Sequence, residues 1–377
     1  MISIWEKNSF IYYDHLIIGS GIVGLSAAYF LQKKYPQQKI LILERGLIPS
    51  GASTKNAGFA CMGSVTELLD DLQSMSEEEV VALFLLRKKG LATLTSILGK
   101  ESMEYSADGS YELIHKHDIE VTTQIDKLNK LLRKELGGDA FSMANEKIDS
   151  FAFNPTEVEA LIENKFEGQI DTGKMMSALI RLVQSVGVEI KTGCEVNAFY
   201  ETSTHVEVVC NQLSDLPISF FGKTLSICTN AFTKSLLPEL DIKPGRGQVL
   251  ITKPIQGLKF KGIFHMDKGY FYFREYHNRV LFGGGRNLDF NTETTTEFAL
   301  NKQIQDELIH RLQHTILPNH SFEVDMQWAG IMAFGSDKQP ILKPYSSRIF
   351  IGVRMGGMGV AIGSEIGFAL SEMIVQH

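Results

Sequence analysis

Three glycines near the start of the chain have the spacing of a phosphate-binding turn. Gly19, Gly21 and Gly24 follow the apolar run Leu16–Ile18 and precede a stretch rich in small residues. This order predicts a strand, a tight turn and a helix whose first N–H groups are free to bind an anion. Gly19 would permit the turn, Gly21 would let the backbone approach a pyrophosphate, and Gly24 would let the helix pack closely on the strand.

A carboxylate stands where a second strand should end. The apolar run Ile40–Leu43 leads into Glu44, about twenty residues beyond Gly24. A carboxylate at this place can accept hydrogen bonds from the ribose hydroxyls of an adenosine, and it disfavours a 2′-phosphate, which argues against NADP. Together the two elements predict a βαβ unit that binds a dinucleotide.

Length and composition bound the kind of protein that carries this unit. A chain of 377 residues is long enough for two domains. Its net charge of −7, without a long basic run, argues against a general nucleic-acid surface. The four cysteines form no CxxC pair and no zinc-like spacing with histidine, so no metal site is predicted. Residues 1–13 lack signal-peptide features and no apolar run could span a bilayer, so we expect a cytoplasmic protein.

The rest of the chain mixes helical and strand patterns. Ser76 and Glu79 form a capping box at the start of a predicted helix. Further helices are expected at 127–136, 173–186 and 296–312, and at the C-terminal end after a strand at 349–353. Strand patterns dominate 188–228 and 244–286. The mixture predicts a nucleotide domain built from distant pieces of chain, with a β-rich domain inserted between them.

Several separated motifs resemble those of the D-amino-acid oxidase/glycine oxidase (DAO) superfamily of FAD-dependent oxidoreductases. They are the glycine turn, Glu44-Arg45-Gly46, the segment 51–58, Gly245-Arg246-Gly247-Gln248, Trp328-Ala329-Gly330 and Met355–Val360. The resemblance extends over nearly the whole chain, and the opening Ile4-Trp5-Glu6 is similar to γ-glutamylputrescine oxidase-type members.

The resemblance implies a fold of class α/β plus β with two domains. A Rossmann-like FAD-binding domain of the glutathione-reductase type would be built from the discontinuous segments 1–75, 165–240 and 330–377. An inserted α+β substrate domain, centred on an antiparallel sheet, would be built from 76–164 and 241–329.

The resemblance also implies which residues hold FAD. The segment 51–58 would run beside the pyrophosphate and the isoalloxazine ring, where Lys55 or Asn56 could hydrogen-bond the ring. The turn 354–360 would point N–H groups at the flavin O2 and stabilise negative charge there. The predicted cofactor-binding residues are Gly19, Gly21, Ile22, Val23, Gly24, Glu44, Arg45, Gly51, Ala52, Ser53, Lys55, Asn56, Ala57, Gly58, Val196, Thr229, Asn230, Met355, Gly356, Gly357, Met358, Gly359 and Val360.

The family's shared chemistry is hydride transfer from a carbon that bears nitrogen, or less often oxygen, to flavin N5. We therefore expect an oxidoreductase that acts on a small amine or N-substituted amino acid, with O2 or a redox carrier as electron acceptor. Some members bind FAD covalently through Cys or His, but the matching segments 50–54 and 331–337 contain neither residue, so non-covalent FAD is predicted.

The substrate side departs from the family pattern. Amino-acid oxidases of this family clamp the substrate carboxylate with an arginine where this chain has Met332, and with a second where it has Gly357. The residues predicted to act on the substrate instead are Tyr270, Tyr272, Arg286 and Arg354. Arg274 is a further candidate cation, and His265 is expected to be a buried histidine with satisfied hydrogen bonds.

Four other functions stay open at this stage. A 2-hydroxy-acid dehydrogenase would use the same flavin chemistry on a C–O bond. A tRNA-modifying amine oxidase shares Gly245–Gln248 and the last glycine turn, although the acidic charge and the lack of a partner domain argue against it. A non-catalytic flavin-binding protein would hold FAD that no donor reduces. An NAD-linked dehydrogenase would leave 51–58 and the last glycines unexplained.

Overall fold

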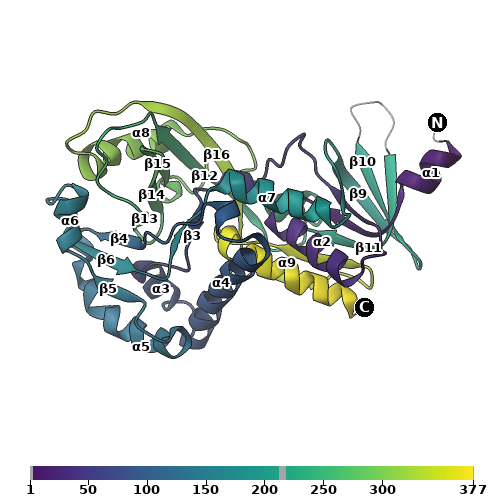
Figure 1. Ribbon diagram of the computed structural model, residues 1–377, viewed down its shortest axis with the longest axis horizontal. Coiled ribbons are helices and arrows are strands. Elements are labelled where there is room, and N and C mark those ends of the chain that lie inside the picture. Colours follow the sequence, from purple (N-terminus) through teal and green to yellow (C-terminus); the bar gives the residue numbers. More distant parts are fainter. Residues whose placement is uncertain (1–2, 212–217, 377) are drawn as a thin grey trace.

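The computed structural model describes residues 3–211 and 218–376, which form two lobes side by side (Figure 1). One lobe carries the chain's first helix, α1 (Ile4–Phe10), and the C-terminal helix α9 (Gly359–Val375). Each lobe is built on an eight-stranded sheet. Among the described residues, no helix is both long enough and apolar enough to cross a bilayer.

The first sheet is parallel at its centre. Its parallel strands, in spatial order, are β18 (Ile349–Val353), β11 (Ile218–Ile227), β1 (Tyr12–Ile18), β2 (Ile40–Leu43) and β8 (Glu189–Lys191). Strand β17 (Ile341–Pro344) pairs antiparallel with β18, and β10 (Val206–Asn211) pairs antiparallel with β11 and β9 (Glu195–Glu201). Every residue of β2 and β18 is buried, as expected for a parallel sheet covered on both faces.

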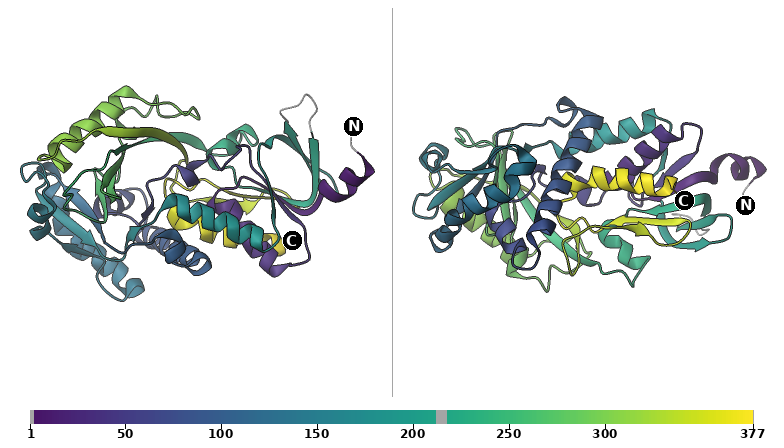
Figure 2. Two further views of the ribbon diagram at one scale, coloured as in Figure 1. Left: turned by 45° about the horizontal axis from the view of Figure 1, so that its top comes forward. Right: turned by 90° about the horizontal axis from the view of Figure 1, so that it is seen from below.

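Three helices lie together against the first sheet (Figure 2). They are α2 (Ile22–Lys34), α7 (Thr172–Ser185) and α9. Small residues let α2 and α9 pack closely: a Cβ added at Gly367 would lie 2.6 Å from the Cβ of Ser26 and 2.7 Å from the Val23 carbonyl oxygen. The helix after the glycine turn is therefore fixed by the last helix of the chain.

The second sheet is antiparallel except for one pair. Its order is β16 (Val324–Phe334), β12 (Lys243–Thr252), β15 (Arg279–Gly284), β14 (Phe271–Tyr276), β13 (Ile263–Met266), β4 (Ser110–Ile114), β6 (Ala160–Asn164) and β5 (Phe141–Met143). Strands β13 and β4 are parallel. The core of this lobe is rich in phenylalanine, and the rings of Phe264 and Phe273 stack at 4.6 Å.

Helices surround the second sheet and link it to the first. They are α3 (Val65–Asp71), α4 (Glu77–Leu98), α5 (Ile125–Leu136), α6 (Glu146–Phe151) and α8 (Lys302–Arg311). The predicted capping box of Ser76 and Glu79 starts α4. Helix α4 packs on α9, and a two-stranded sheet of β3 (Phe59–Ala60) and β7 (Gly168–Gln169) lies between the lobes.

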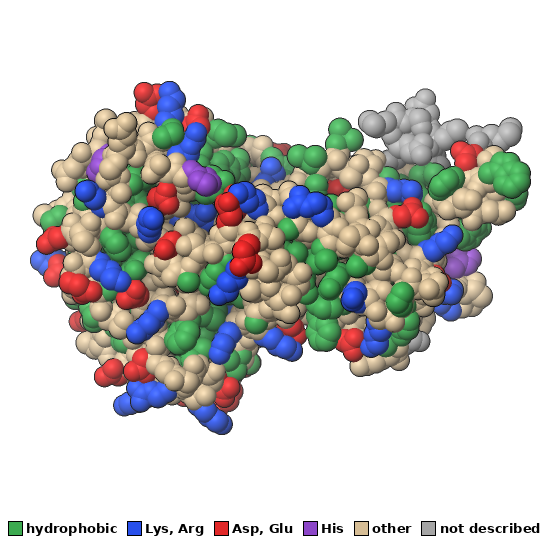
Figure 3. Space-filling view, in the orientation of Figure 1, with side chains coloured by type: hydrophobic (Ala, Val, Ile, Leu, Met, Phe, Trp, Pro, Cys, Tyr) green, Lys and Arg blue, Asp and Glu red, His purple; other side chains and the backbone are tan. Residues whose placement is uncertain are grey.

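The predicted helix at 296–312 begins in the wrong place. The structure has α8 only from Lys302, capped by the Asn301 side chain, and residues 312–316 continue as a short π-helical turn. Residues 296–301 form no helix, and the preceding loop is held by the buried side chain of Glu293. Figure 3 shows charges of both signs interspersed over one face of both lobes.

Candidate functional site

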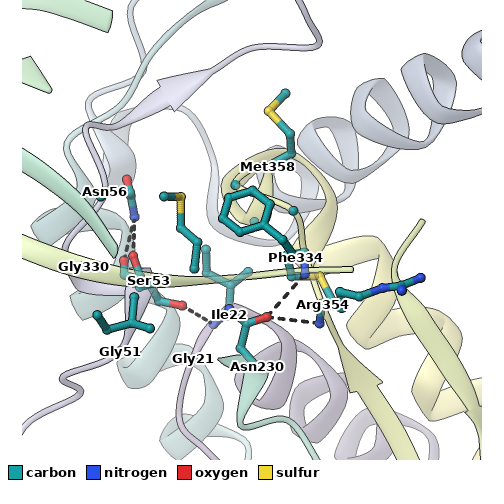
Figure 4. A pocket seen from close by; sticks show the side chains of 18 of the residues that line it. Gly21, Ile22, Gly51, Ser53, Asn56, Asn230, Gly330, Phe334, Arg354 and Met358 are labelled. Atoms are coloured by element: carbon teal, nitrogen blue, oxygen red, sulfur yellow. Dashed lines mark hydrogen bonds between the residues drawn. The ribbon is translucent and has the colours of Figure 1, made fainter. Parts of the chain in front are cut away.

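A cavity of about 1400 Å³ runs between the two lobes. It is larger than the roughly 300–1,000 Å³ of most ligand pockets, so it can hold an elongated cofactor together with a second molecule. Of the predicted cofactor residues, only Gly24 and Gly58 do not line it, and Tyr270, Tyr272, Arg286 and Arg354 line it as well. Segments from both ends of the chain and from its middle thus meet around one space (Figure 4).

The glycine turn has the geometry that a close approach requires. Gly19 has φ +102°, a conformation that L side chains rarely adopt. A Cβ at Gly24 would lie 2.1 Å from the Gly19 carbonyl oxygen, so Gly24 fixes the packing of helix on strand. The Ile22 N–H at the start of α2 donates to Ser53 Oγ at 3.0 Å, which ties the turn to the loop 51–58. The N–H groups of Val23 and Gly24 have no acceptor within the described part of the chain.

Glu44 lies at the tip of β2 and is already partly engaged. Its Oε2 accepts from the Ser20 N–H at 3.0 Å and from Ser20 Oγ at 2.7 Å, and its Oε1 accepts from the Gly46 N–H at 3.0 Å. A carboxylate offers about four lone-pair positions, so Oε1 keeps room for a further donor from the cavity. The backbone of Cys194 donates to the Glu44 carbonyl oxygen and brings Val196 to the same end of the cavity.

The loop 51–58 is held in shape by Asn56, whose amide hydrogen-bonds within the protein. Its Nδ2 donates to the carbonyl oxygens of Ala52 and Ser53, and its Oδ1 accepts from the Gly58 N–H and from Thr172 Oγ1. The interpretation that Asn56 hydrogen-bonds a flavin ring is therefore replaced by a role in shaping the loop. The Lys55 carbonyl oxygen accepts from Trp328 Nε1 at 3.0 Å, which fixes the loop to β16.

Arg274 also supports this loop. Its Nη1 donates to the carbonyl oxygens of Gly58 at 3.0 Å and Ile170 at 2.7 Å, and it is buried outside the cavity. Burial lowers its pKa to about 10. The structure therefore does not offer Arg274 to a substrate.

The last glycine-rich turn presents free N–H groups to the cavity. Asn230 Oδ1 accepts from the N–H groups of Arg354 at 3.1 Å and Met355 at 3.3 Å and so holds the turn in place (Figure 4). The N–H groups of Gly357, Gly359 and Val360, at the positive end of α9, have no acceptor within 3–211 and 218–376.

Arg354 was predicted to meet an anionic substrate, and the structure corrects this. Its Nη1 lies 2.8 Å from Asp241 Oδ2, its Nη2 lies 2.5 Å from Asp337 Oδ1, and its Nε donates to the Gln339 carbonyl oxygen. The side chain runs away from Ile22 and Ser53 (Figure 4). Its charge is neutralised by two carboxylates, so Arg354 buttresses the turn instead.

The wall made by the second sheet carries tyrosines and a histidine. Phe271 and Phe273 face the core, whereas Tyr270 and Tyr272 line the cavity. Burial raises the pKa of Tyr272 to about 12, so its hydroxyl is neutral at physiological pH. His265 pairs in register with Tyr272, and burial lowers its pKa to about 4.

The histidine was expected to be satisfied, and this is wrong: its Nε2 has no hydrogen-bond partner in the described chain.

Comparison with known proteins fits this geometry. A family model described as "FAD dependent oxidoreductase" (DAO) matches residues 14–373. The chain belongs to the DAO family. A bovine (Bos taurus) protein, FAD-dependent oxidoreductase domain-containing protein 1, is 26% identical over 212 residues, which are 53% of this chain and 40% of that protein; the chain thus matches less than half of that relative's length.

Solved structures share the fold at low sequence identity. Glycine oxidase from Geobacillus kaustophilus superposes with a TM-score of 0.80 at 18% identity, over 97% of this chain and 95% of that one. L-proline dehydrogenase from P. horikoshii superposes with a TM-score of 0.77 at 18% identity, over 97% and 94%. These structures show that the fold is shared, and the family model over residues 14–373 confirms the predicted DAO family of FAD-dependent oxidoreductases.

Sequence reasoning missed two ion pairs that line the cavity. Glu67 Oε1 lies 3.2 Å from Arg87 Nη1, and Lys268 Nζ lies 2.7 Å from Asp70 Oδ1. These residues come from α3, α4 and the turn between β13 and β14, and no local pattern in the sequence joins them. They place fixed charges, already paired, in the cavity wall.

Proposed function

We propose that this DAO-family protein oxidises the C–N bond of a small amine or an N-substituted amino acid, with non-covalently bound FAD as the hydride acceptor. The observation that carries the proposal is the single cavity that joins the start of α2, the turn before α9 and the tyrosine wall of the second sheet. In this assignment the first sheet and its helices are the FAD-binding domain and the second sheet is the substrate domain. The boundary predicted near 330 falls within β16.

The residues present fit FAD along its length. Glu44 and Val196 would hold the adenosine end, and the free N–H group of Val23 would face the pyrophosphate. Gly357, Gly359 and Val360 would donate to the flavin O2, where negative charge gathers on reduction. Bound FAD supplies the hydride acceptor at N5, and the protein orients the substrate and excludes water.

The chemistry of the cavity thiols supports non-covalent binding. Cys61, Cys194 and Cys228 line the cavity. Burial raises the pKa of the Cys61 and Cys228 thiols, to about 12 for Cys228, so neither is a thiolate nucleophile at neutral pH. Cys194 lies at the Glu44 end, away from the predicted flavin ring.

His265 and Tyr272 in the cavity wall are uncharged, which favours a substrate amine that is also uncharged when it reacts. His265 and Tyr272 can hydrogen-bond a substrate nitrogen, but neither carries charge at pH 7. A substrate ammonium would lose its hydration there without a counter-ion from these two residues, so it would have to shed its proton before reaction.

One experiment tests this function. The purified protein should be yellow, acid precipitation should release all the colour into the supernatant, and anaerobic addition of amines and N-alkyl amino acids should bleach the absorbance near roughly 450 nm. Recovery of the colour in air would make O2 the electron acceptor, whereas recovery only with an added dye would indicate a redox carrier. Bleaching by 2-hydroxy acids and by no amine would replace the proposal with a hydroxy-acid dehydrogenase.

A further inference from the structure

Arg286 differs from the other arginines at the substrate end of the cavity. Arg87 is paired with Glu67, and Arg354 is paired with two aspartates. Arg286 lies in the 3-10 turn that follows β15 and lines the same cavity, half-buried. In the described ranges it has neither a hydrogen-bond acceptor nor a carboxylate within 4.0 Å. A guanidinium partly removed from water and left without an anion is an open site for one.

Two aromatic rings hold this guanidinium in place. Its Cζ lies 4.0 Å from the centre of the Phe334 ring and 4.8 Å from that of Phe290. Cation–π contacts fix the group without neutralising its charge. Tyr270 packs its ring edge-on against Phe290 at 5.8 Å and lines the same cavity.

Glu293 acts electrostatically on Arg286 but does not compensate its charge. Glu293 is fully buried, and both its oxygens lie 2.8 Å from nitrogens of Arg246. Its Oε2 also accepts from Gln248 Nε2 at 2.9 Å and its Oε1 from Asn301 Nδ2 at 3.1 Å. The negative charge of Glu293 therefore belongs to Arg246, and Arg286 keeps a net positive charge toward the cavity.

The guanidinium reaches the neighbourhood of Met332 from another strand. Gly245 pairs in register with Met332, and a Cβ added at Gly245 would lie 3.3 Å from Arg286 Nη1 and 2.4 Å from the Phe334 ring. Glycine at 245 thus makes room for both side chains. The cation lies beside the position at which the sequence lacks its expected arginine, but it comes from the turn just after β15 instead of from β16.

We propose that Arg286, with the hydroxyl of Tyr270, binds an anionic group of the substrate, so that the substrate is a carboxylate-bearing amine and not a plain amine. This assignment rests on the proposed function for the reaction, but its test does not. Arg286 would determine specificity in place of the arginine that the sequence lacks at Met332. It would orient the substrate from the side of the cavity where β15 ends.

Binding of unreactive carboxylates tests the proposal. Acetate, 2-furoate, benzoate and phenylacetate, each beside its amide, are titrated into the FAD-loaded protein while the flavin spectrum and the thermal midpoint are followed. At least one carboxylate should bind about tenfold or more tightly than its amide, and Arg286→Gln should weaken the carboxylate by about 10- to 100-fold and the amide hardly at all. Arg286→Lys should recover part of the loss, because it restores the charge without the planar fork.

The matched control is Arg181→Gln, which removes an arginine from the exposed side of α7 and should change nothing. If no carboxylate binds to the wild-type protein, or if Arg286→Gln keeps the preference over amides, the proposal is wrong. Reduction of the flavin by amines in that case would leave the proposed reaction standing. Carboxylate binding through Arg286, without reduction of the flavin by any amine, would support the anion site and contradict the proposed reaction.

Discussion

Single residues in this protein owe their roles to partners far away in the chain. Gly19, Gly24 and Glu44 could be interpreted from sequence because their partners lie within about thirty residues in a recurrent unit. Arg354 could not, because its partners Asp241 and Asp337 come from two other segments. The same holds for Asn56, whose hydrogen bond to Thr172 joins two distant segments. Charge and residue type predict that an arginine will bind an anion, but only the fold shows which anion is near.

The buried carboxyl group of Glu167 leads to a prediction about how the stability of the protein depends on pH. Its Oε1 accepts from the N–H groups of Met62 at 2.6 Å and Gly63 at 3.1 Å, but burial outweighs these bonds and raises its pKa from 4.5 to about 7. The folded protein therefore binds the proton more tightly than the unfolded chain, and this group makes stability fall as the pH rises from about 4.5 to about 7. The penalty is absent below that window and complete above it, at most about 3 kcal/mol.

Glu167→Gln should remove this penalty. The free energy of unfolding of the variant minus that of the wild type, measured by urea denaturation, should increase from pH 5 to pH 8 by about 1–3 kcal/mol. Glu112 has a similar raised pKa in both proteins and cancels in the difference. A difference that stays flat across this range would contradict the assignment.

Among the elements, the loop between β15 and α8 is the one that sequence patterns misjudged. The apolar and polar spacing of 296–312 favoured one helix. In the structure, residues 296–301 instead form a non-helical segment that brings Phe298 to the cavity. Its ring stacks near Phe232 at 6.3 Å, and Arg45 lies 3.5 Å from the centre of that second ring. Tertiary contacts here override the local helical preference.

The anchor of this loop can be tested. Glu293→Gln would leave Arg246 buried without its counter-ion, so we expect a loss of about 3–5 kcal/mol in the free energy of unfolding. Glu297→Gln, an exposed change on the same loop, should cost less than about 0.5 kcal/mol. Both values come from urea denaturation, and equal effects of the two changes would show that Glu293 does not hold the loop.

For the whole molecule, the relation of the two lobes depends on close packing of two helices. A Cβ added at Gly90 of α4 would lie 2.0 Å from the Ala361 carbonyl oxygen and 2.9 Å from the Ile362 Cα in α9. Neither helix could move without shifting the turn that lines the cavity. The sequence predicted two interleaved domains but not this contact, because a lone glycine in a helical pattern carries no signal of what it faces.

Gly90→Ala should therefore separate α4 from α9. Alanine favours a helix over glycine by about 1 kcal/mol, yet overpacking at this contact should lower the free energy of unfolding by about 1–3 kcal/mol. The variant should also release FAD at lower temperature, which flavin fluorescence during a thermal ramp would record. Gly138→Ala adds the same methyl group where nothing lies within 4 Å, and it should leave both readings unchanged. Wild-type behaviour of Gly90→Ala would contradict this view of the interface.

The position of α9 in the chain also matters for biosynthesis. Strand β18 and helix α9 are translated after every other described part of the cavity wall. They complete the first sheet, and the free backbone N–H groups at the start of α9 line the cavity. A nascent chain on the ribosome thus has its glycine turn and its tyrosine wall in place before it can retain a flavin. Cofactor capture should therefore follow the synthesis of α9, and flavin-starved cells should accumulate a colourless protein in which α9 is the first helix to fray.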